Sequence, residues 1–159
     1  MKIRILCVGK LKEKYLTDGI KEYSKRLSGY CDFEIIEVPD EKTPANSSEK
    51  DEIIIKDKES ERLLSKIKEQ DYVILLDVKS KEYDSVTFSK EIEKVMVNGK
   101  STIDFVIGGS LGHGEKMYLR ADSKVSFSKM TFPHQLMRLI LIEQIYRAFK
   151  IMKNETYHK

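Results

Sequence analysis

The sequence predicts an α/β fold in which a mostly parallel sheet carries helices on both faces. Three observations lead to this class. Five short apolar runs rich in Ile, Val, Phe or Tyr have the length of strands. Longer polar stretches with helical spacing lie between them, and the two kinds of segment alternate along the chain. Right-handed crossovers place helices on the faces of such a sheet, and ligands then lie at the carboxyl ends of its strands.

The first half of the chain is expected to contribute two strands and two helices. Residues 3–8 ("IRILCV") and 33–38 ("FEIIEV") are the strands, and residues 13–27 place their apolar side chains on one side of a helix. Residues 39–52 hold two of the three prolines, a Ser-Ser cap and few apolar residues, so we expect a loop there. This loop leads into a charged helix over residues 53–68.

The second half contains three further strands, at residues 72–78, 102–108 and 124–128. Between the first two of them, residues 85–99 have helical spacing and end at Asn98-Gly99. The last helix, residues 134–152, differs because its apolar residues surround most of its circumference, which requires burial on more than one side. We expect the second side to face another subunit in a two-fold dimer; the alternative is a central helix in the core of a monomer.

Composition describes an ordinary globular protein that we expect to form a single domain over residues 1–159. Residues 110–159 hold nine Lys or Arg against four Asp or Glu, an asymmetry that attracts a polyanion, although a solvated surface produces the same count. Cys7 and Cys31 match no metal or redox spacing and are interpreted as small buried residues of a reducing compartment. No signal peptide or membrane span is evident, so a cytoplasmic location is expected.

Half of the eight glycines lie in residues 107–114, "IGGSLGHG", directly after a predicted strand. Such a cluster indicates that the backbone adopts positive φ or approaches a ligand closely. The spacing fits neither the dinucleotide fingerprint nor the P-loop, and Glu115 at the following helix start repels phosphate, so the expected ligand is not a bare polyphosphate. Residues 75–77 and 126–138 are two further strand ends, and together the three are expected to form one pocket.

The segments "FVIGGSLGHG", "FSKMTFPHQLMRLILIEQIYRAFKI" and the terminal "NETYHK" resemble the RlmH family of the SPOUT superfamily. These enzymes methylate a pseudouridine of large-subunit ribosomal RNA. The resemblance covers the whole chain and implies a C-terminal trefoil knot, a homodimer and S-adenosylmethionine as cofactor. It also implies the cofactor-binding residues, which are Leu76, Gly108, Phe127, Ser128, Lys129, Met130, Thr131 and Phe132. We assign no role to His113.

The terminal residues Tyr157 and His158 are our candidate catalytic residues. They follow a helix expected at a dimer interface, from which the tail would reach the partner's cofactor pocket. There Tyr157 would contact the target base and His158 would accept or relay a proton. The alternative is a frayed terminus without a role.

The resemblance therefore implies an S-adenosylmethionine-dependent methyltransferase acting on N3 of a pseudouridine in 23S ribosomal RNA. We expect it to act within the assembled ribosome, with no metal and no membrane. Basic residues of the C-terminal third would favour the N3 anion and contact RNA phosphates. The alternative function is a non-catalytic RNA- or nucleotide-binding module on a flavodoxin-like sheet.

Overall fold

Strands and helices alternate strictly in the computed structural model, which describes residues 1–159. The strands are β1 (Lys2–Val8), β2 (Asp32–Val38), β3 (Tyr72–Leu76), β4 (Thr102–Ile107) and β5 (Ser123–Val125). The helices are α1 (Lys14–Leu27), α2 (Glu49–Leu64), α3 (Ser85–Val97), α4 (Glu115–Arg120) and α5 (His134–Met152). The five-fold alternation predicted from the sequence is confirmed.

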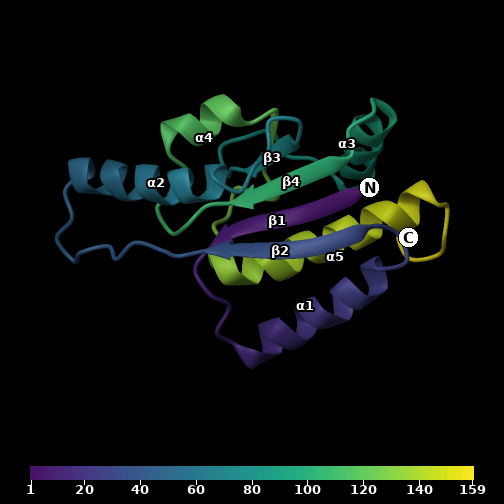
Figure 1. The fold of residues 1–159 in the computed structure, drawn as a ribbon. Coiled ribbons are helices and arrows are strands. Elements are labelled where there is room, and N and C mark those ends of the chain that lie inside the picture. The colour runs from purple at the N-terminus through teal and green to yellow at the C-terminus, as the bar shows by residue number, and fades with distance from the viewer.

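The strands form one sheet in the order β2-β1-β4-β3-β5, and every pair is parallel. The arrowheads of β1, β2 and β4 in Figure 1 point the same way. A flavodoxin-like sheet has the order 2-1-3-4-5. Because β3 and β4 are exchanged relative to that order, the flavodoxin-like sheet of the alternative function is wrong.

Helices cover both faces of the sheet, as predicted. Residues of α1, α3 and α5 pack into the larger core on one face, and residues of α2 and α4 pack into a smaller core on the other. Figure 1 shows α2 and α4 above the sheet and α1 and α5 below it. The connections through α1 and α3 each lead to the neighbouring strand on the β2 side of the sheet, whereas those through α2 and α4 lead toward the β5 side. Right-handed crossovers therefore place the two groups of helices on opposite faces.

The central strands β1 and β4 are buried on both faces. Ile5 pairs with Phe105 and contributes to the larger core, whereas its neighbour Leu6 pairs with Val106 and contributes to the smaller one. Alternate residues of a strand point to opposite faces, so a strand covered on both sides is a continuous apolar run. Cys7 is fully buried in the larger core, where burial raises the pKa of its thiol to about 12, while Cys31 is only half-buried.

One charged cluster interrupts the smaller core. Arg4 donates from Nε to Asp104 Oδ1 at 2.6 Å and from Nη2 to Asp104 Oδ2 at 2.9 Å and Asp71 Oδ2 at 3.2 Å. All three side chains are buried, and Asp104 is fully inaccessible. Burial raises the pKa of Asp104 to about 6 despite the hydrogen bonds from Arg4, which act in the opposite direction.

Several predicted boundaries differ from the structure, and two of the differences have local causes. The helix expected from residue 53 begins at Glu49, because Ser48 and Asp51 form a reciprocal capping box. The strand expected to reach Val78 ends at Leu76, because the next residues turn: Ser80 N–H donates to the Asp77 carbonyl, and Lys79 N–H donates to the Asp77 carboxylate. β5 is likewise shorter than predicted.

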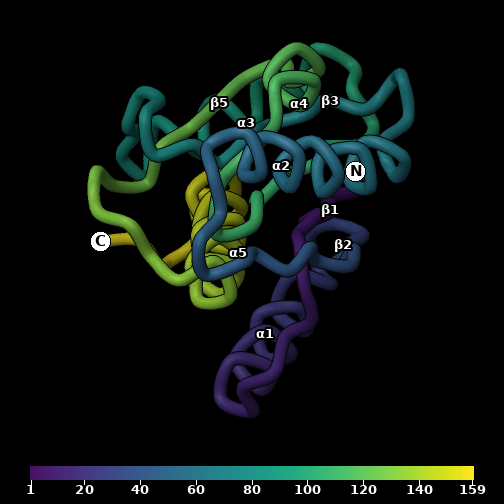
Figure 2. Tube along the Cα trace, turned by 90° about the vertical axis from the view of Figure 1, so that its left-hand side faces the viewer, coloured from purple at the N-terminus to yellow at the C-terminus, as the bar shows by residue number.

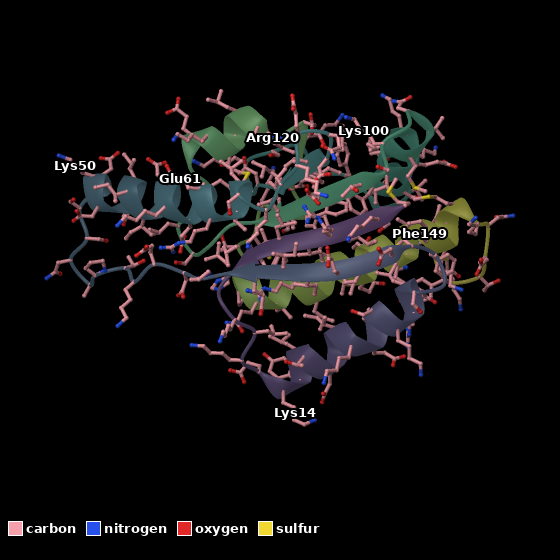
Figure 3. The ribbon with its side chains drawn as sticks, in the orientation of Figure 1. Lys14, Lys50, Glu61, Lys100, Arg120 and Phe149 are labelled. Atoms are coloured by element: carbon pink, nitrogen blue, oxygen red, sulfur yellow. The ribbon has the colours of Figure 1, made fainter.

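Burial within one chain explains part of the apolar circumference of α5. The side chains of Ile142 and Ile145 are fully buried in the larger core, where α5 packs against α1 and α3. In Figure 3, Phe149 of α5 lies beneath the sheet, whereas Lys14 and Lys50 project outward from their helices. Four apolar residues of the same helix are only half-buried: Leu136, Leu139, Ile140 and Ile151. One chain therefore does not cover the whole apolar circumference, and the dimer stays a prediction. None of the helices is both long enough and apolar enough to cross a membrane.

Candidate functional site

A cavity of about 830 Å³ lies at the carboxyl ends of the neighbouring strands β3, β4 and β5. Figure 2 views the molecule from this side, with the segment between β5 and α5 at the left. The connections that follow the three strands line the cavity, together with the first turn of α5. The three strand ends singled out in the sequence thus meet in one pocket, at the edge of a parallel sheet where ligands bind.

Seven of the eight predicted cofactor-binding residues line this cavity: Leu76, Gly108, Phe127, Ser128, Met130, Thr131 and Phe132. Lys129 does not, and its side chain is exposed. The hydroxyl of Ser128 accepts a hydrogen bond from Met130 N–H at 3.0 Å, which forms a tight turn with Lys129 at its tip. Cofactor binding by these residues remains a prediction, and the geometry does not favour a direct contact from the Lys129 side chain.

The glycine cluster lets the loop after β4 pack closely against α2 and against itself. A Cβ at Gly109 would lie 2.7 Å from Glu59 Oε1, and one at Gly114 would lie 2.7 Å from Asp57 Oδ1. At Gly108 a Cβ would meet the backbone of Gly112 at 3.0 Å. The missing side chains of these glycines admit α2 and the loop itself, and close approach of a ligand to Gly108 stays a prediction.

The loop after β4 folds back on itself between Gly109 and Gly112. Gly112 N–H donates to the Gly109 carbonyl at 3.0 Å, and Gly112 has φ +95°, a conformation that favours glycine. The reversal brings His113 against the end of β3, where its Nε2 lies 2.9 Å from the Leu76 carbonyl oxygen. His113 is buried and belongs to the cavity wall.

The cavity walls combine apolar side chains with polar and charged ones. Phe127 contacts Phe88 edge-on at a centroid distance of 5.5 Å, which fixes one wall. Lys56 of α2 and Lys79 after β3 contribute positive charge, and Asp77 contributes the carboxylate. The sequence pattern does not reveal Lys56, because α2 reaches the cavity only through the tertiary packing of Gly109 and Gly114 against it.

Arg138 joins the first part of α5 to the loop after β1. It is fully buried, donates from Nη1 to Glu37 Oε2 at 2.6 Å, and donates from Nη2 to the Val8 and Gly9 carbonyls at 2.8 Å each. His134, one turn earlier, lines the cavity, and burial lowers the pKa of its imidazole. These contacts fix the start of α5, and hence the segment that precedes it.

The predicted catalytic residues do not line this cavity. Tyr157 donates from Oη to Glu143 Oε1 at 3.0 Å, and its ring packs edge-on against Tyr146. Burial raises the pKa of its phenol. His158 Nδ1 lies 3.1 Å from Arg147 Nη1. The tail therefore folds back on its own α5.

His158 lies instead at a second cavity of about 480 Å³, lined also by residues of α3 and α5. The two cavities share Val125, Phe127 and Phe132. Within one subunit, a wall of these side chains therefore separates His158 from the predicted cofactor site.

A family model described as "Predicted SPOUT methyltransferase" matches residues 1–158 of the chain. The chain is 62% identical to ribosomal RNA large subunit methyltransferase H 1 of Clostridium perfringens (strain SM101 / Type A). It is 54% identical to ribosomal RNA large subunit methyltransferase H of Enterococcus faecalis (strain ATCC 700802 / V583), and both alignments cover 100% of each protein.

Among solved structures, the chain is similar to a probable methylase family protein from Haemophilus influenzae Rd KW20, with a TM-score of 0.50 and 11% sequence identity. That match covers 96% of this chain and 66% of the other. At this identity the likeness concerns the fold alone.

Proposed function

The chain belongs to the SPOUT methyltransferase family, and from that premise we propose that it methylates N3 of a pseudouridine in 23S ribosomal RNA with S-adenosylmethionine as methyl donor. The curated relatives, which are named for methylation of large-subunit ribosomal RNA, support the substrate class. The observation that carries the proposal is the cavity at the ends of β3, β4 and β5, which is lined by seven of the eight residues implied by the family resemblance.

The residues present fit the donor's chemistry. When bound, S-adenosylmethionine supplies a methyl group on a cationic sulfonium, and it carries no phosphate. The cavity offers the apolar side chains of Phe127, Met130 and Phe132, and its carboxylate, Asp77, is complementary to a cation. Its volume of about 830 Å³ falls within the usual range for sites that enclose small molecules.

The protein's task in an in-line methyl transfer is to hold the acceptor nitrogen on the far side of the methyl group. Such positioning contributes several kcal/mol to catalysis. Lys56 and Lys79 at the cavity supply positive charge that favours both RNA phosphates and the deprotonated N3. Binding and orientation of the donor rest on the three strand-end connections, which one edge of the sheet holds together.

We assign the tail to the acceptor side of the reaction in a homodimer. Tyr157 and His158 lie outside their own subunit's first cavity, so a role at the transferring methyl group requires the cavity of a partner. Because the Arg147 guanidinium can only donate, it occupies the lone pair of His158 Nδ1, and Nε2 then carries the ring proton. In this arrangement His158 donates from Nε2, and it accepts the N3 proton only after leaving Arg147. The trefoil knot belongs to the same proposal.

Calorimetric titration with S-adenosylmethionine is the first test, because the rival, a non-catalytic RNA-binding module, predicts no affinity for the donor. Absence of binding at millimolar donor would end the enzyme proposal. Methyl transfer is then measured on free 23S RNA, separated large subunits and whole ribosomes, and the modified nucleoside is identified by mass spectrometry. We expect a methylated pseudouridine, formed most rapidly on whole ribosomes.

A further inference from the structure

His113 joins two of the three strand ends that form the donor cavity. Its Nε2 lies 2.9 Å from the carbonyl oxygen of Leu76, which is 37 residues earlier in the sequence and belongs to β3. The histidine itself follows the glycine loop after β4 and is 8% exposed. One side chain thus connects the end of β3 to the loop after β4 at the cavity wall.

The hydrogen bond defines the state of the ring. A carbonyl oxygen only accepts, so Nε2 carries the proton and Nδ1 has a bare lone pair. Burial lowers the pKa of His113, which keeps the ring neutral at neutral pH. Nδ1 is buried and has no hydrogen-bond partner. An unpartnered buried acceptor is unfavourable, so an apolar side chain of similar size would suit this position better if packing were its only purpose.

The surroundings leave the ring little freedom. Tyr118 of α4 packs edge-on against it at a centroid distance of 5.8 Å and an interplanar angle of 86°. On another side, the ring carbon Cε1 lies 3.1 Å from the place where a Cβ at Gly108 would stand. The imidazole is therefore enclosed by α4, the glycine loop and the end of β3, and its donor is aimed at Leu76.

We propose that His113 is a positioning residue of the methyl-donor cavity, which holds the glycine loop and the Leu76 carbonyl in the arrangement that binds the donor. The inference rests on the proposed function, because it takes the cavity to be the donor site. His113 does not act on the reacting atoms. It fixes the end of β3 relative to the loop after β4, because the pairing of these two strands stops at Leu75 and Val106.

Three substitutions separate the hydrogen bond from the bulk of the ring. In His113→Gln the amide nitrogen is as many bonds from Cα as Nε2 of histidine and can reach Leu76. In His113→Asn the amide nitrogen takes the place of Nδ1 and falls short. His113→Leu keeps apolar bulk without a donor. Each protein is titrated calorimetrically with S-adenosylmethionine, and thermal unfolding without ligand checks that it is folded.

We expect His113→Leu and His113→Asn to raise the dissociation constant at least tenfold, about 1.4 kcal/mol, and His113→Gln to stay within about threefold of wild type. Wild-type affinity in folded His113→Leu would overturn the inference, as would equal losses in the Gln and Asn variants. If His113→Leu and His113→Asn fail to fold, weak binding by folded His113→Gln overturns it. Failure of the proposed function appears differently, as absence of binding by the wild-type protein.

Discussion

Gly108 lies directly after β4, against Gly112 and His113 of the loop that folds back on it. An added Cβ would stand 3.0 Å from both the carbonyl carbon and oxygen of Gly112 and 3.1 Å from Cε1 of His113. These separations are shorter than the roughly 3.5–4.0 Å at which carbon atoms attract each other best. Two of the three contacts are backbone atoms, which cannot rotate away, so Gly108→Ala must displace the loop.

The displacement falls on the donor cavity, because Gly108, Gly112 and His113 all line it. Overpacking by one methyl group costs about 1–3 kcal/mol, and a cost of this size in the binding-competent loop raises the dissociation constant by about 5- to 150-fold. We therefore expect Gly108→Ala to remain folded and to bind S-adenosylmethionine with a dissociation constant raised by this factor, as measured by calorimetry.

Gly29→Ala is the matched control. Gly29 is not at positive φ, lines neither of the two cavities and has open space where its Cβ would stand. It should bind the donor as the wild-type protein does. Wild-type affinity in folded Gly108→Ala, or an equal loss in the two alanine variants, would refute the argument from crowding.

Three other predictions follow from the fold and the tail. Deleting residues 157–159 should preserve dimerisation and donor affinity but reduce methyl transfer at least tenfold, a loss of at least about 1.4 kcal/mol in single-turnover assays; full activity would remove Tyr157 and His158 from the mechanism. Ile142→Asp should unfold or aggregate, because Ile142 is fully buried within one chain. Leu119→Asp, at an exposed site, should fold normally, and circular dichroism distinguishes the two variants. A folded, monomeric Ile142→Asp protein would instead place Ile142 at a dimer interface. Because the pKa of Asp104 is raised to about 6, its protonation stabilises the folded state fully below about pH 4, and this contribution is lost as the pH rises through about 6. Asp104→Asn should abolish this contribution and change the pH dependence of the unfolding free energy between pH 4 and 7 by up to about 3 kcal/mol. Parallel curves of urea-derived stability against pH for the two proteins would contradict this expectation.

The sheet and its helices were predictable because their signals are local. A strand covered on both faces, such as β1 with Ile5 and Leu6 in different cores, is a continuous apolar run in the sequence. The order of strands was less accessible. Nothing near residue 72 or 102 in the sequence specifies that β4, and not β3, pairs with β1. This order depends on how complete helices pack on the two faces of the sheet.

The site was predictable in part for the same reason. Strand ends are local features, and the resemblance located the segment around Phe127, but neither predicts the direction of each side chain. The sequence therefore does not reveal that the Lys129 side chain lies at an exposed turn, and cofactor binding by Lys129 stays a prediction. His113 was left without a role, because its hydrogen bond to Leu76 depends on a loop reversal at Gly112. The apolar circumference of α5 does not identify its neighbour, because an apolar surface does not reveal whether the same chain or a second subunit covers it.

The central position of β1 has a consequence for synthesis of the protein. β1 is the first strand made, and Lys2 pairs with Asp32 on one side and with Thr102 on the other. At roughly 5–20 residues per second, the ribosome releases the second partner about 5–20 s after the first strand. During that interval one edge of β1, a strand that is apolar on both faces, lacks its neighbour. That neighbour, β4, is followed directly by the glycine loop of the proposed donor cavity. Completion of the sheet and assembly of the proposed donor site are thus late and nearly simultaneous events. A chaperone that shields β1 would therefore also set the time at which the proposed donor cavity forms.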